Sequence, residues 1–156
     1  VLDRANAEMT YETEALLYAA SRAQLVREVI RPAVAAGRVV LCDRYVDSSV
    51  AYQGGGRELG IDKVLTINAP AVDGTLPDIT VYLDIDHRKA MARRCAASEP
   101  DRLELEAESF HARVEDGYHQ LIAMDPERFA VVNAEGDRDA IAEEIAQRVL
   151  AYLLRI

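Results

Sequence analysis

The stretch ITVYLDI, residues 79–85, is a mostly apolar run that directly follows Pro77 and Asp78. Two similar runs occur in the chain, VVLC at residues 39–42 and FAVVNA at residues 129–134. Short apolar runs without strict alternation are typical of strands that are buried on both faces, as in a parallel sheet. The sequence therefore predicts three neighbouring parallel strands.

Helical patterns fill the intervals between these runs. Thr10 is a suitable N-cap for a helix that runs to about Arg31, and Glu12 and Glu14 suit the positive end of its dipole. Pro32 should kink or restart this helix, and Gly37 should end it. Further helices are expected at about residues 63–68, 87–97, 106–124 and 137–154. Strands that alternate with helices predict an α/β fold with a parallel sheet, here in one domain over residues 1–156.

The composition narrows the classes of function. The net charge of the 156 residues is −9, which argues against binding to a nucleic acid polymer, because a basic face supplies most of that affinity. Small phosphorylated ligands remain possible, since a few converging arginines can hold them. No apolar run has the length of a membrane span. Cys42 and Cys95 have no metal-type neighbours and are expected to be reduced thiols in a cytoplasmic protein.

Polar side chains gather directly after the first predicted strand, in DRYVDSSVAYQGGGREL, residues 43–59. Ligands of open α/β sheets bind beyond the carboxyl ends of the strands, which is where Asp43 and Arg44 lie. Arg44 offers a fork of donors that suits a phosphate, although an Arg–Asp pair can also be purely structural. Asp43 either holds a metal-bound water or caps the following turn.

The rest of this stretch has two interpretations. Ser48 and Ser49 either hydrogen-bond a ligand or cap a helix. The three glycines at residues 54–56 match neither the Walker A phosphate loop nor GxGxxG, so by themselves they indicate only a loose turn.

Tyr18 and Arg22 form a second candidate pair, because residues four apart lie on the same face of a helix. An aromatic ring can stack on a base, and an arginine one turn later can donate to the edge of that base. Taken separately, the tyrosine fits a core and the arginine a solvated face. Arg22 interrupts an apolar stripe, however, and a charge on a buried face needs a partner or a ligand.

Arg93, Arg94 and Arg102 flank the small and polar interval CAASEP. The interval is either a mobile lid that carries arginines or an ordinary connection between two helices. The sequence does not separate these alternatives.

Together these segments resemble thymidylate kinase, a family of P-loop nucleoside-monophosphate kinases. LLYAASRAQ resembles the helix that carries an aromatic and an arginine for the thymine base, and DRYVDSSVAYQGGGREL resembles the signature segment. LPDITVYLDI resembles the next strand, and DRLELEAESFHARVEDGYHQL the lid and the helix after it. The resemblance implies a three-layer α/β/α fold and the reaction ATP + dTMP → ADP + dTDP with Mg²⁺, a step of dTTP biosynthesis.

The resemblance also implies roles for individual residues at the base and phosphate. Arg44 would bind the 5′-phosphate of dTMP, and Tyr18 would stack on thymine. Arg22 would donate to the thymine O4, which leaves a donor–donor conflict with the amino group of cytosine. Ser49 and Gln53 would lie near the base.

Further roles concern the sugar, the metal and ATP. Tyr52 would lie against the deoxyribose, where a 2′-hydroxyl would clash. Asp43 would serve the magnesium site indirectly, through water. Arg94 and Arg102 would belong to a lid over ATP at about residues 93–105. The family also implies a homodimer packed through helices.

The sequence departs from the family pattern in two ways. No GxxxxGK[ST] occurs in the 156 residues, so the first strand, the phosphate loop and the second strand of the family are expected to be missing from them. No arginine lies between Arg94 and Arg102, which thins the lid. Because phosphoryl transfer depends on positioning and charge stabilisation, we expect little kinase activity from these residues alone. A non-catalytic nucleotide-binding module and a deoxynucleoside kinase remain alternatives, although SSVAYQG speaks against the latter.

Overall fold

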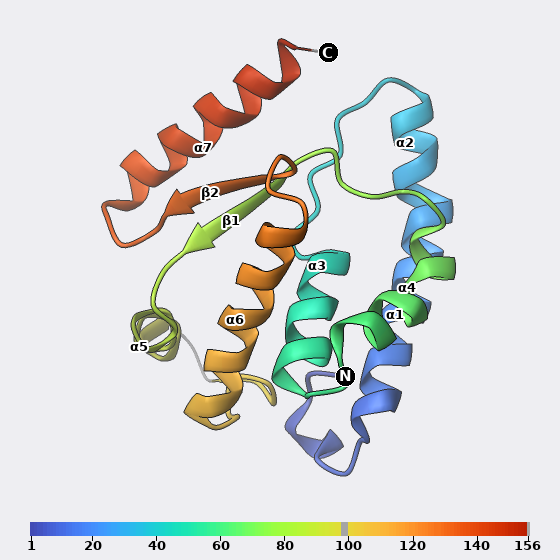
Figure 1. Ribbon diagram of the computed structural model, residues 1–156, viewed down its shortest axis with the longest axis vertical. Helices are drawn as coiled ribbons and strands as arrows, with labels where there is room; N and C mark the ends of the chain where they lie inside the picture. The colour runs from blue at the N-terminus through green and yellow to red at the C-terminus, as the bar shows by residue number, and fades with distance from the viewer. Residues whose placement is uncertain (98–99, 156) are drawn as a thin grey trace. The chain divides into compact units, whose positions relative to one another are not determined.

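The computed structural model describes residues 1–97 and 100–155. The chain divides into two compact units, Val1–Leu76 with Glu99–Leu121, and Pro77–Ser98 with Ile122–Ile156. Figure 1 labels the main helices and strands of both units. The single domain expected from the sequence stays a prediction.

The first unit opens with a short 3-10 turn, η1 (Arg4–Asn6), and then one long helical segment. This segment consists of α1 (Tyr11–Leu25), the π-type turn η2 (Val26–Ile30) and α2 (Arg31–Ala35). Thr10 accepts a hydrogen bond from the Thr13 N–H, which confirms it as the N-cap. Pro32 lies in the first turn of α2, where its missing N–H costs little, and Gly37 follows the helix end with a φ of 71°. The predicted helix and its stop are therefore confirmed, whereas at Pro32 the backbone stays helical on both sides, with the π-type turn η2 directly before α2.

The first of the three predicted strands is absent. Residues 39–42 form no strand in the described part of the chain, and the side chains of Val39 and Leu41 are 62% and 86% exposed. A strand forms only when a neighbouring strand satisfies its backbone groups, and no described segment pairs with this one. The prediction of a buried strand at residues 39–42 was therefore wrong for this structure.

The signature stretch is more helical than expected. It forms α3 (Val46–Ser49), which continues into a second π-type segment, η3 (Val50–Gly56). The serines at positions 48 and 49 lie inside this helix and do not cap it. The glycines at residues 54–56 belong to its last turn, so the prediction of a loose turn was wrong.

These glycines allow a close contact with α6 (Glu108–Met124). A Cβ on Gly55 would lie 2.8 Å from the Arg113 carbonyl oxygen, and one on Gly56 would lie 2.6 Å from the Phe110 ring. On the other side, a Cβ on Gly117 of α6 would lie 3.1 Å from the Cα of Ala51. Close packing of the two helices explains why the sequence carries glycine here.

The remaining helix of the first unit is α4 (Ile61–Val72), which packs against α1 and η3. It extends the predicted helix at 63–68 in both directions and ends at Asp73, whose φ is 47°. Part of the core of this unit is a cluster of buried apolar residues, namely Ala51, Leu103, Phe110 and Val114. The core therefore joins the signature helix, which consists of α3 and η3, to α6 and to the segment before α6.

The second unit contains the sheet of the described residues. Strands β1 (Thr80–Asp84) and β2 (Phe129–Asn133) pair in parallel, with Thr80 opposite Phe129 and Asp84 opposite Asn133. Its other elements are α5 (His87–Ala97) and α7 (Arg138–Leu153). Asp137 caps α7 by accepting from two backbone N–H groups. Two of the three predicted strands, and the α/β fold class, are thus confirmed.

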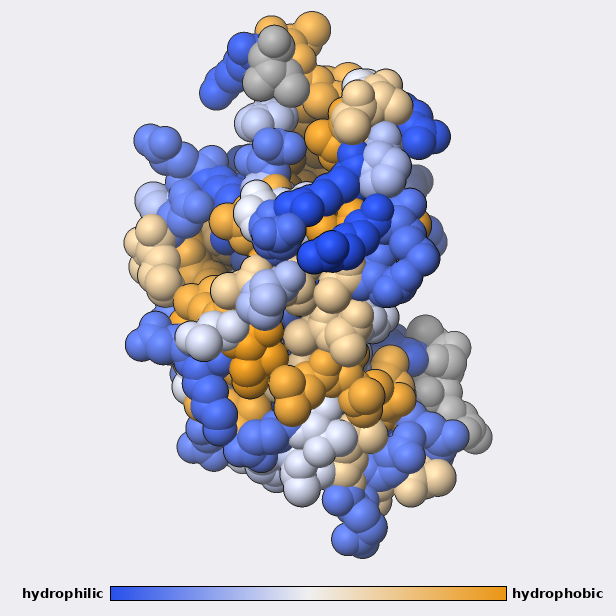
Figure 2. Space-filling model, turned by 90° about the vertical axis from the view of Figure 1, so that its right-hand side faces the viewer, coloured by the Kyte–Doolittle hydropathy of each residue, from blue (hydrophilic) through white to orange (hydrophobic). Residues whose placement is uncertain are grey.

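Apolar side chains are exposed along the helical segment of the first unit. Leu16, Val29 and Val34 are each more than half exposed there. Figure 2 shows apolar residues among charged ones on the face that this view presents. No helix in the described residues is long and apolar enough to cross a membrane.

Candidate functional site

All the site residues predicted from the sequence except Arg94 lie in the first unit. Arg94 lies half-buried in α5 of the second unit, which bears Arg93 one residue earlier. The proposed lid at about residues 93–105 contains two residues, 98 and 99, that lie outside the described residues. The lid therefore stays a prediction.

Arg22 is buried in the first unit, on the face of α1 that packs inward. One of its terminal nitrogens donates to Asn68 Oδ1, and the other donates to Ser49 Oγ (2.8 Å) and to the Tyr45 carbonyl (3.1 Å). Burial lowers the pKa of Arg22. The nearby groups of Tyr45, Cys42 and Asp47 raise this pKa, but burial outweighs them. The sequence argument that this arginine needs a partner is confirmed, and it has three.

Tyr18 lies one turn before Arg22 on α1 and is half-buried. Burial, together with the nearby carboxylate of Glu14, raises the pKa of its phenol. The ring therefore stays neutral and largely apolar in character, which suits a stacking surface.

Arg44 has a backbone φ of 60°, a left-handed conformation that residues other than glycine rarely adopt. Its guanidinium lies over the Tyr52 ring, with 5.1 Å between Cζ and the ring centroid. Burial lowers the pKa of Arg44, but Tyr52, Tyr118 and Asp43 outweigh it and raise that pKa overall. The guanidinium is thus a cation that lies over an aromatic ring, although the residue as a whole is exposed.

A tyrosine that the sequence analysis did not single out completes this cluster. Tyr118 of α6 shares a hydrogen bond of 2.8 Å with Ser48 of α3. Burial raises the pKa of Tyr118 to about 12. The phenol is therefore neutral and adds a polar group beside Arg44 and Tyr52.

A buried carboxylate lies at the other end of the inward face of α1. Glu14 is fully buried and accepts a hydrogen bond of 2.8 Å from the Gln53 amide. It also pairs with Arg57, at 3.3 Å, and with Arg102. Burial raises the pKa of Glu14, but hydrogen bonds from Arg102, Gln53 and Arg57 outweigh it and lower that pKa overall.

Glu14 and Arg57 were missed as members of the site. From the sequence, Glu14 was expected to interact with the positive end of the helix dipole. It does lie in the first turn of α1, as this role requires. Its spacing was the available signal, because Glu14, Tyr18 and Arg22 follow one another at intervals of four and share a helix face. Arg102 was expected in a lid, and here its side chain is buried against Glu14 and donates to the Val1 carbonyl.

Asp43 is the predicted indirect magnesium ligand, and it is exposed next to Arg44. No group of three or more His, Cys, Asp or Glu residues is placed to hold a metal ion within the described residues. Mg²⁺ is commonly bound through one or two carboxylates, several waters and substrate phosphates. A single carboxylate therefore fits Mg²⁺ only as part of a site that a phosphate completes.

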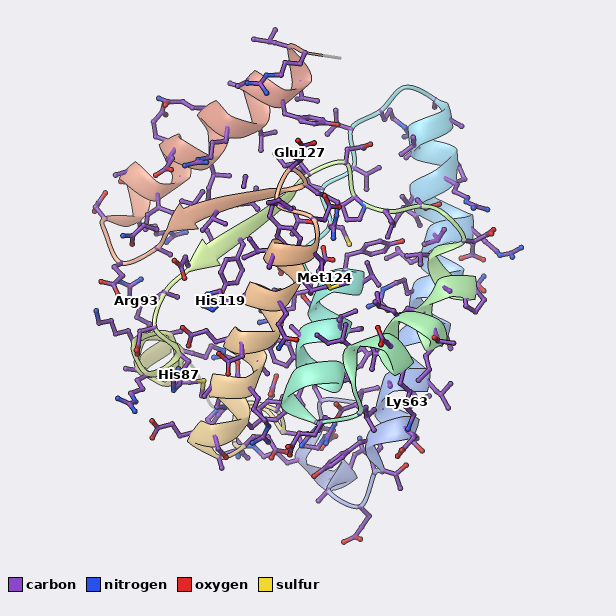
Figure 3. The ribbon with its side chains drawn as sticks, in the orientation of Figure 1. Lys63, His87, Arg93, His119, Met124 and Glu127 are labelled. Carbon is purple, nitrogen blue, oxygen red and sulfur yellow. The ribbon has the colours of Figure 1, made fainter. Side chains whose placement is uncertain are left out.

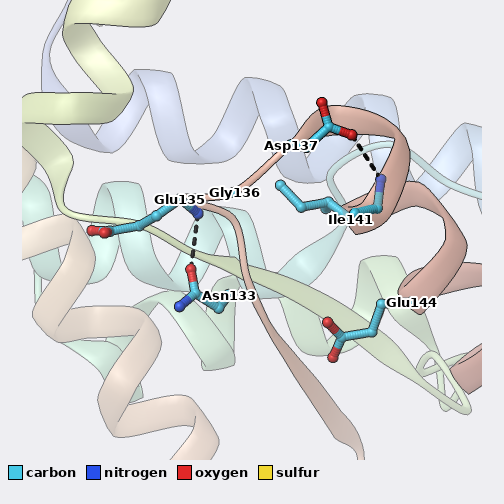
Figure 4. Close-up of a pocket in the computed structure, with 7 residues that line it drawn as sticks. Asn133, Glu135, Gly136, Asp137, Ile141 and Glu144 are labelled. Carbon is cyan, nitrogen blue, oxygen red and sulfur yellow. Dashed lines mark hydrogen bonds between the residues drawn. The ribbon is translucent and has the colours of Figure 1, made fainter.

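The second unit has a pocket that the sequence did not predict, shown in Figure 4. It has a volume of about 420 Å³ and lies after the carboxyl end of β2, between Asn133 and the first turns of α7. Arg93 of α5, labelled in Figure 3, donates to the carbonyls of Ala134 and Glu135 at the edge of this loop. Ligands of parallel sheets bind at this end of the strands, which was the available signal.

Comparison with known proteins identifies the family. A family model described as thymidylate kinase matches residues 1–145. The chain is 46% identical to a thymidylate kinase of Limosilactobacillus fermentum, over 97% of this chain and 72% of that protein. It is 49% identical to one of Levilactobacillus brevis, over 90% and 67% of the two chains, and 42% identical to one of Bacillus velezensis, over 100% and 74%. With its α/β fold and its buried arginine site, the chain belongs to the thymidylate kinase family of phosphotransferases.

Proposed function

We propose that the first unit of this chain binds dTMP for phosphorylation to dTDP, with ATP as the donor and Mg²⁺ as the metal. The observation that carries the proposal is the environment of Arg22. Among the described residues, the hydrogen bonds of this buried cation go to neutral acceptors, in Asn68, Ser49 and the Tyr45 carbonyl, while the carboxylate of Asp47 acts on it through charge. A buried guanidinium whose hydrogen bonds go to neutral acceptors is well suited to read an uncharged carbonyl oxygen of a ligand.

The thymine base would occupy the space beside Tyr18 and Arg22. Tyr18 would stack on the ring, and Arg22 would donate to O4. Ser49 and Gln53 would complete the surroundings of the base, since Ser49 is hydrogen-bonded to Arg22 and Gln53 is held by Glu14. An amino group at this position of cytosine would face an N–H donor and leave both unpaired, which is costly in a buried site.

The sugar and phosphate would lie against the cluster around Arg44. Arg44 would bind the 5′-phosphate, and Tyr52 would contact the deoxyribose. The left-handed backbone of Arg44 supports this role, because strained backbone conformations cluster at ligand sites. Asp43, which directly precedes Arg44, would serve Mg²⁺ through water once phosphate is present, and the ion would neutralise developing charge during transfer.

For ATP the proposal rests on the family resemblance. Arg94 and Arg102 would belong to a lid over ATP, and Arg102 would first have to leave its buried contact with Glu14. We further propose a cytoplasmic homodimer, supported by the exposed apolar side chains of Leu16, Val29 and Val34.

The test is calorimetric titration of the purified 156 residues with dTMP, thymidine and dCMP, together with a coupled assay of ADP release. We expect dTMP to bind more tightly than thymidine or dCMP. We expect slow turnover, because these residues contain no GxxxxGK[ST] sequence. Absence of dTMP binding would overturn the proposed site, and tighter binding of thymidine than dTMP would favour a deoxynucleoside kinase.

A further inference from the structure

Asn68 of α4 is a buried polar residue to which neither the sequence pattern nor the proposed roles assign a function. Its side chain is fully buried. Its amide nitrogen donates to the Val64 carbonyl at 2.9 Å, one turn earlier in the same helix. Since the nitrogen is used in this way, the amide oxygen faces the other direction, where it accepts a hydrogen bond from Arg22 Nη1.

Arg22 is thereby held from three separate places in the first unit. Asn68 binds one terminal nitrogen from α4, and Ser49 of α3 and the Tyr45 carbonyl bind the other. The Tyr45 ring lies against the guanidinium plane, with 5.4 Å between Cζ and the ring centroid. Because the guanidinium is planar and rigid, these contacts fix both its position and its orientation.

The same contacts leave some N–H donors of the Arg22 guanidinium for a ligand. Both N–H donors of Nη2 are used, by Ser49 and Tyr45. One donor of Nη1 is used by Asn68. The Nε donor and the second Nη1 donor have no acceptor among the described residues.

We propose that Asn68 is a positioning residue for base selection, which acts by holding Arg22 so that one of its two remaining donors can face the base. The inference rests on the proposed function, in which Arg22 reads O4 of thymine. Ser49 and Tyr45 bind only the Nη2 end of the fork, so without Asn68 the guanidinium can rotate about that end. Loss of Asn68 should then weaken discrimination between dTMP and dCMP more than it weakens binding of the shared sugar and phosphate.

The test uses calorimetric titration of the 156-residue chain with dTMP and dCMP, and the ratio of the two Kd values is the readout. Asn68→Leu removes both polar atoms and keeps the branching of the side chain, whereas Asn68→Asp keeps an oxygen that can accept from Arg22. Thr66→Ala, at an exposed position of the same helix, is the matched control. A thermal melt of each variant separates folding from binding, and Asn68→Ser replaces the Leu variant if that variant does not fold.

We expect Asn68→Leu to lower the preference for dTMP about tenfold, which is the effect of one buried hydrogen bond. Asn68→Asp should keep most of the preference even though it loses the bond to the Val64 carbonyl. The double variant Arg22→Ala with Asn68→Leu should show the same preference as Arg22→Ala alone, because both act through one guanidinium.

An unchanged preference in Asn68→Leu, or an equal loss in Asn68→Leu and Asn68→Asp, would overturn the inference and leave Asn68 with a packing role. Additive losses in the double variant would also overturn it. These outcomes differ from failure of the proposed function itself, which would appear as absence of a dTMP preference in the unmutated chain.

Discussion

Glu14 and Arg57 face each other in the interior of the first unit, with 3.3 Å between Oε2 and Nη2. Their side chains are 0% and 2% exposed. Arg57 also pairs with Glu106 at 2.5 Å, and Glu14 also binds Arg102 and Gln53. One buried carboxylate thus ties α1 to the signature helix and to the segment before α6.

Removing this carboxylate should destabilise the chain strongly. Glu14→Ala would leave Arg57 and Arg102 as buried charges with fewer partners, and breaking such a pair typically costs about 3–5 kcal/mol. Glu12→Ala is the matched control, because Glu12 pairs with Lys63 at 3.0 Å while both side chains are about half exposed. Solvent screens such a pair, so the control should melt close to the unmutated chain. Equal shifts of Tm in the two variants would contradict the structural role of Glu14.

The same carboxylate should make stability depend on pH. The pKa of Glu14 is lowered in the folded chain from its ordinary value of 4.5, so the unfolded chain binds more protons than the folded chain in this range. The stabilisation is therefore fully present above pH 4.5 and is lost as the pH falls through the lowered pKa. Urea unfolding at a series of pH values should show this loss. In Glu14→Gln the free energy of unfolding should fall less steeply as the pH is lowered below 4.5. The same decrease in both chains would refute the assignment.

The sequence predicted most of the local structure because the relevant signals are local. The N-cap at Thr10, the stop at Gly37 and the helix at 87–97 each depend on neighbouring residues, and all are confirmed. The strand at 39–42 failed because a strand depends on a partner elsewhere, which its own residues cannot reveal. Local signals therefore fixed helices better than the sheet.

The site shows the same division. Arg22 was identifiable, because a charge interrupts an apolar stripe at a known helical spacing. Asn68 and Arg57 were not, since they meet α1 only through contacts between residues far apart in the chain. The glycines at 54–56 were misjudged for a similar reason, because the helix that they contact, α6, follows about fifty residues later.

The glycine contact gives a prediction about packing. Gly55→Ala would place a Cβ 2.8 Å from the Arg113 carbonyl, so a backbone must move, and such overpacking typically costs about 1–3 kcal/mol. Gly136→Ala is the control, since nothing lies within 4 Å of its added Cβ and its φ is not positive. Chemical unfolding of both variants should show a lower midpoint for Gly55→Ala alone. A midpoint equal to that of the unmutated chain would show that the two helices pack less closely than described.

The last prediction concerns the phosphate of the ligand. Arg44→Ala should weaken dTMP binding about tenfold to a hundredfold, because charge-assisted hydrogen bonds contribute about 1.5–3 kcal/mol each. Ser49→Ala removes a neutral hydroxyl and should weaken it less. Thymidine, which lacks the 5′-phosphate, is the internal control, since its affinity should hardly change in Arg44→Ala. The measurement is calorimetric titration of both variants with both ligands. If Arg44→Ala weakens thymidine and dTMP equally, Arg44 supports the site through its contact with Tyr52 and does not bind the phosphate.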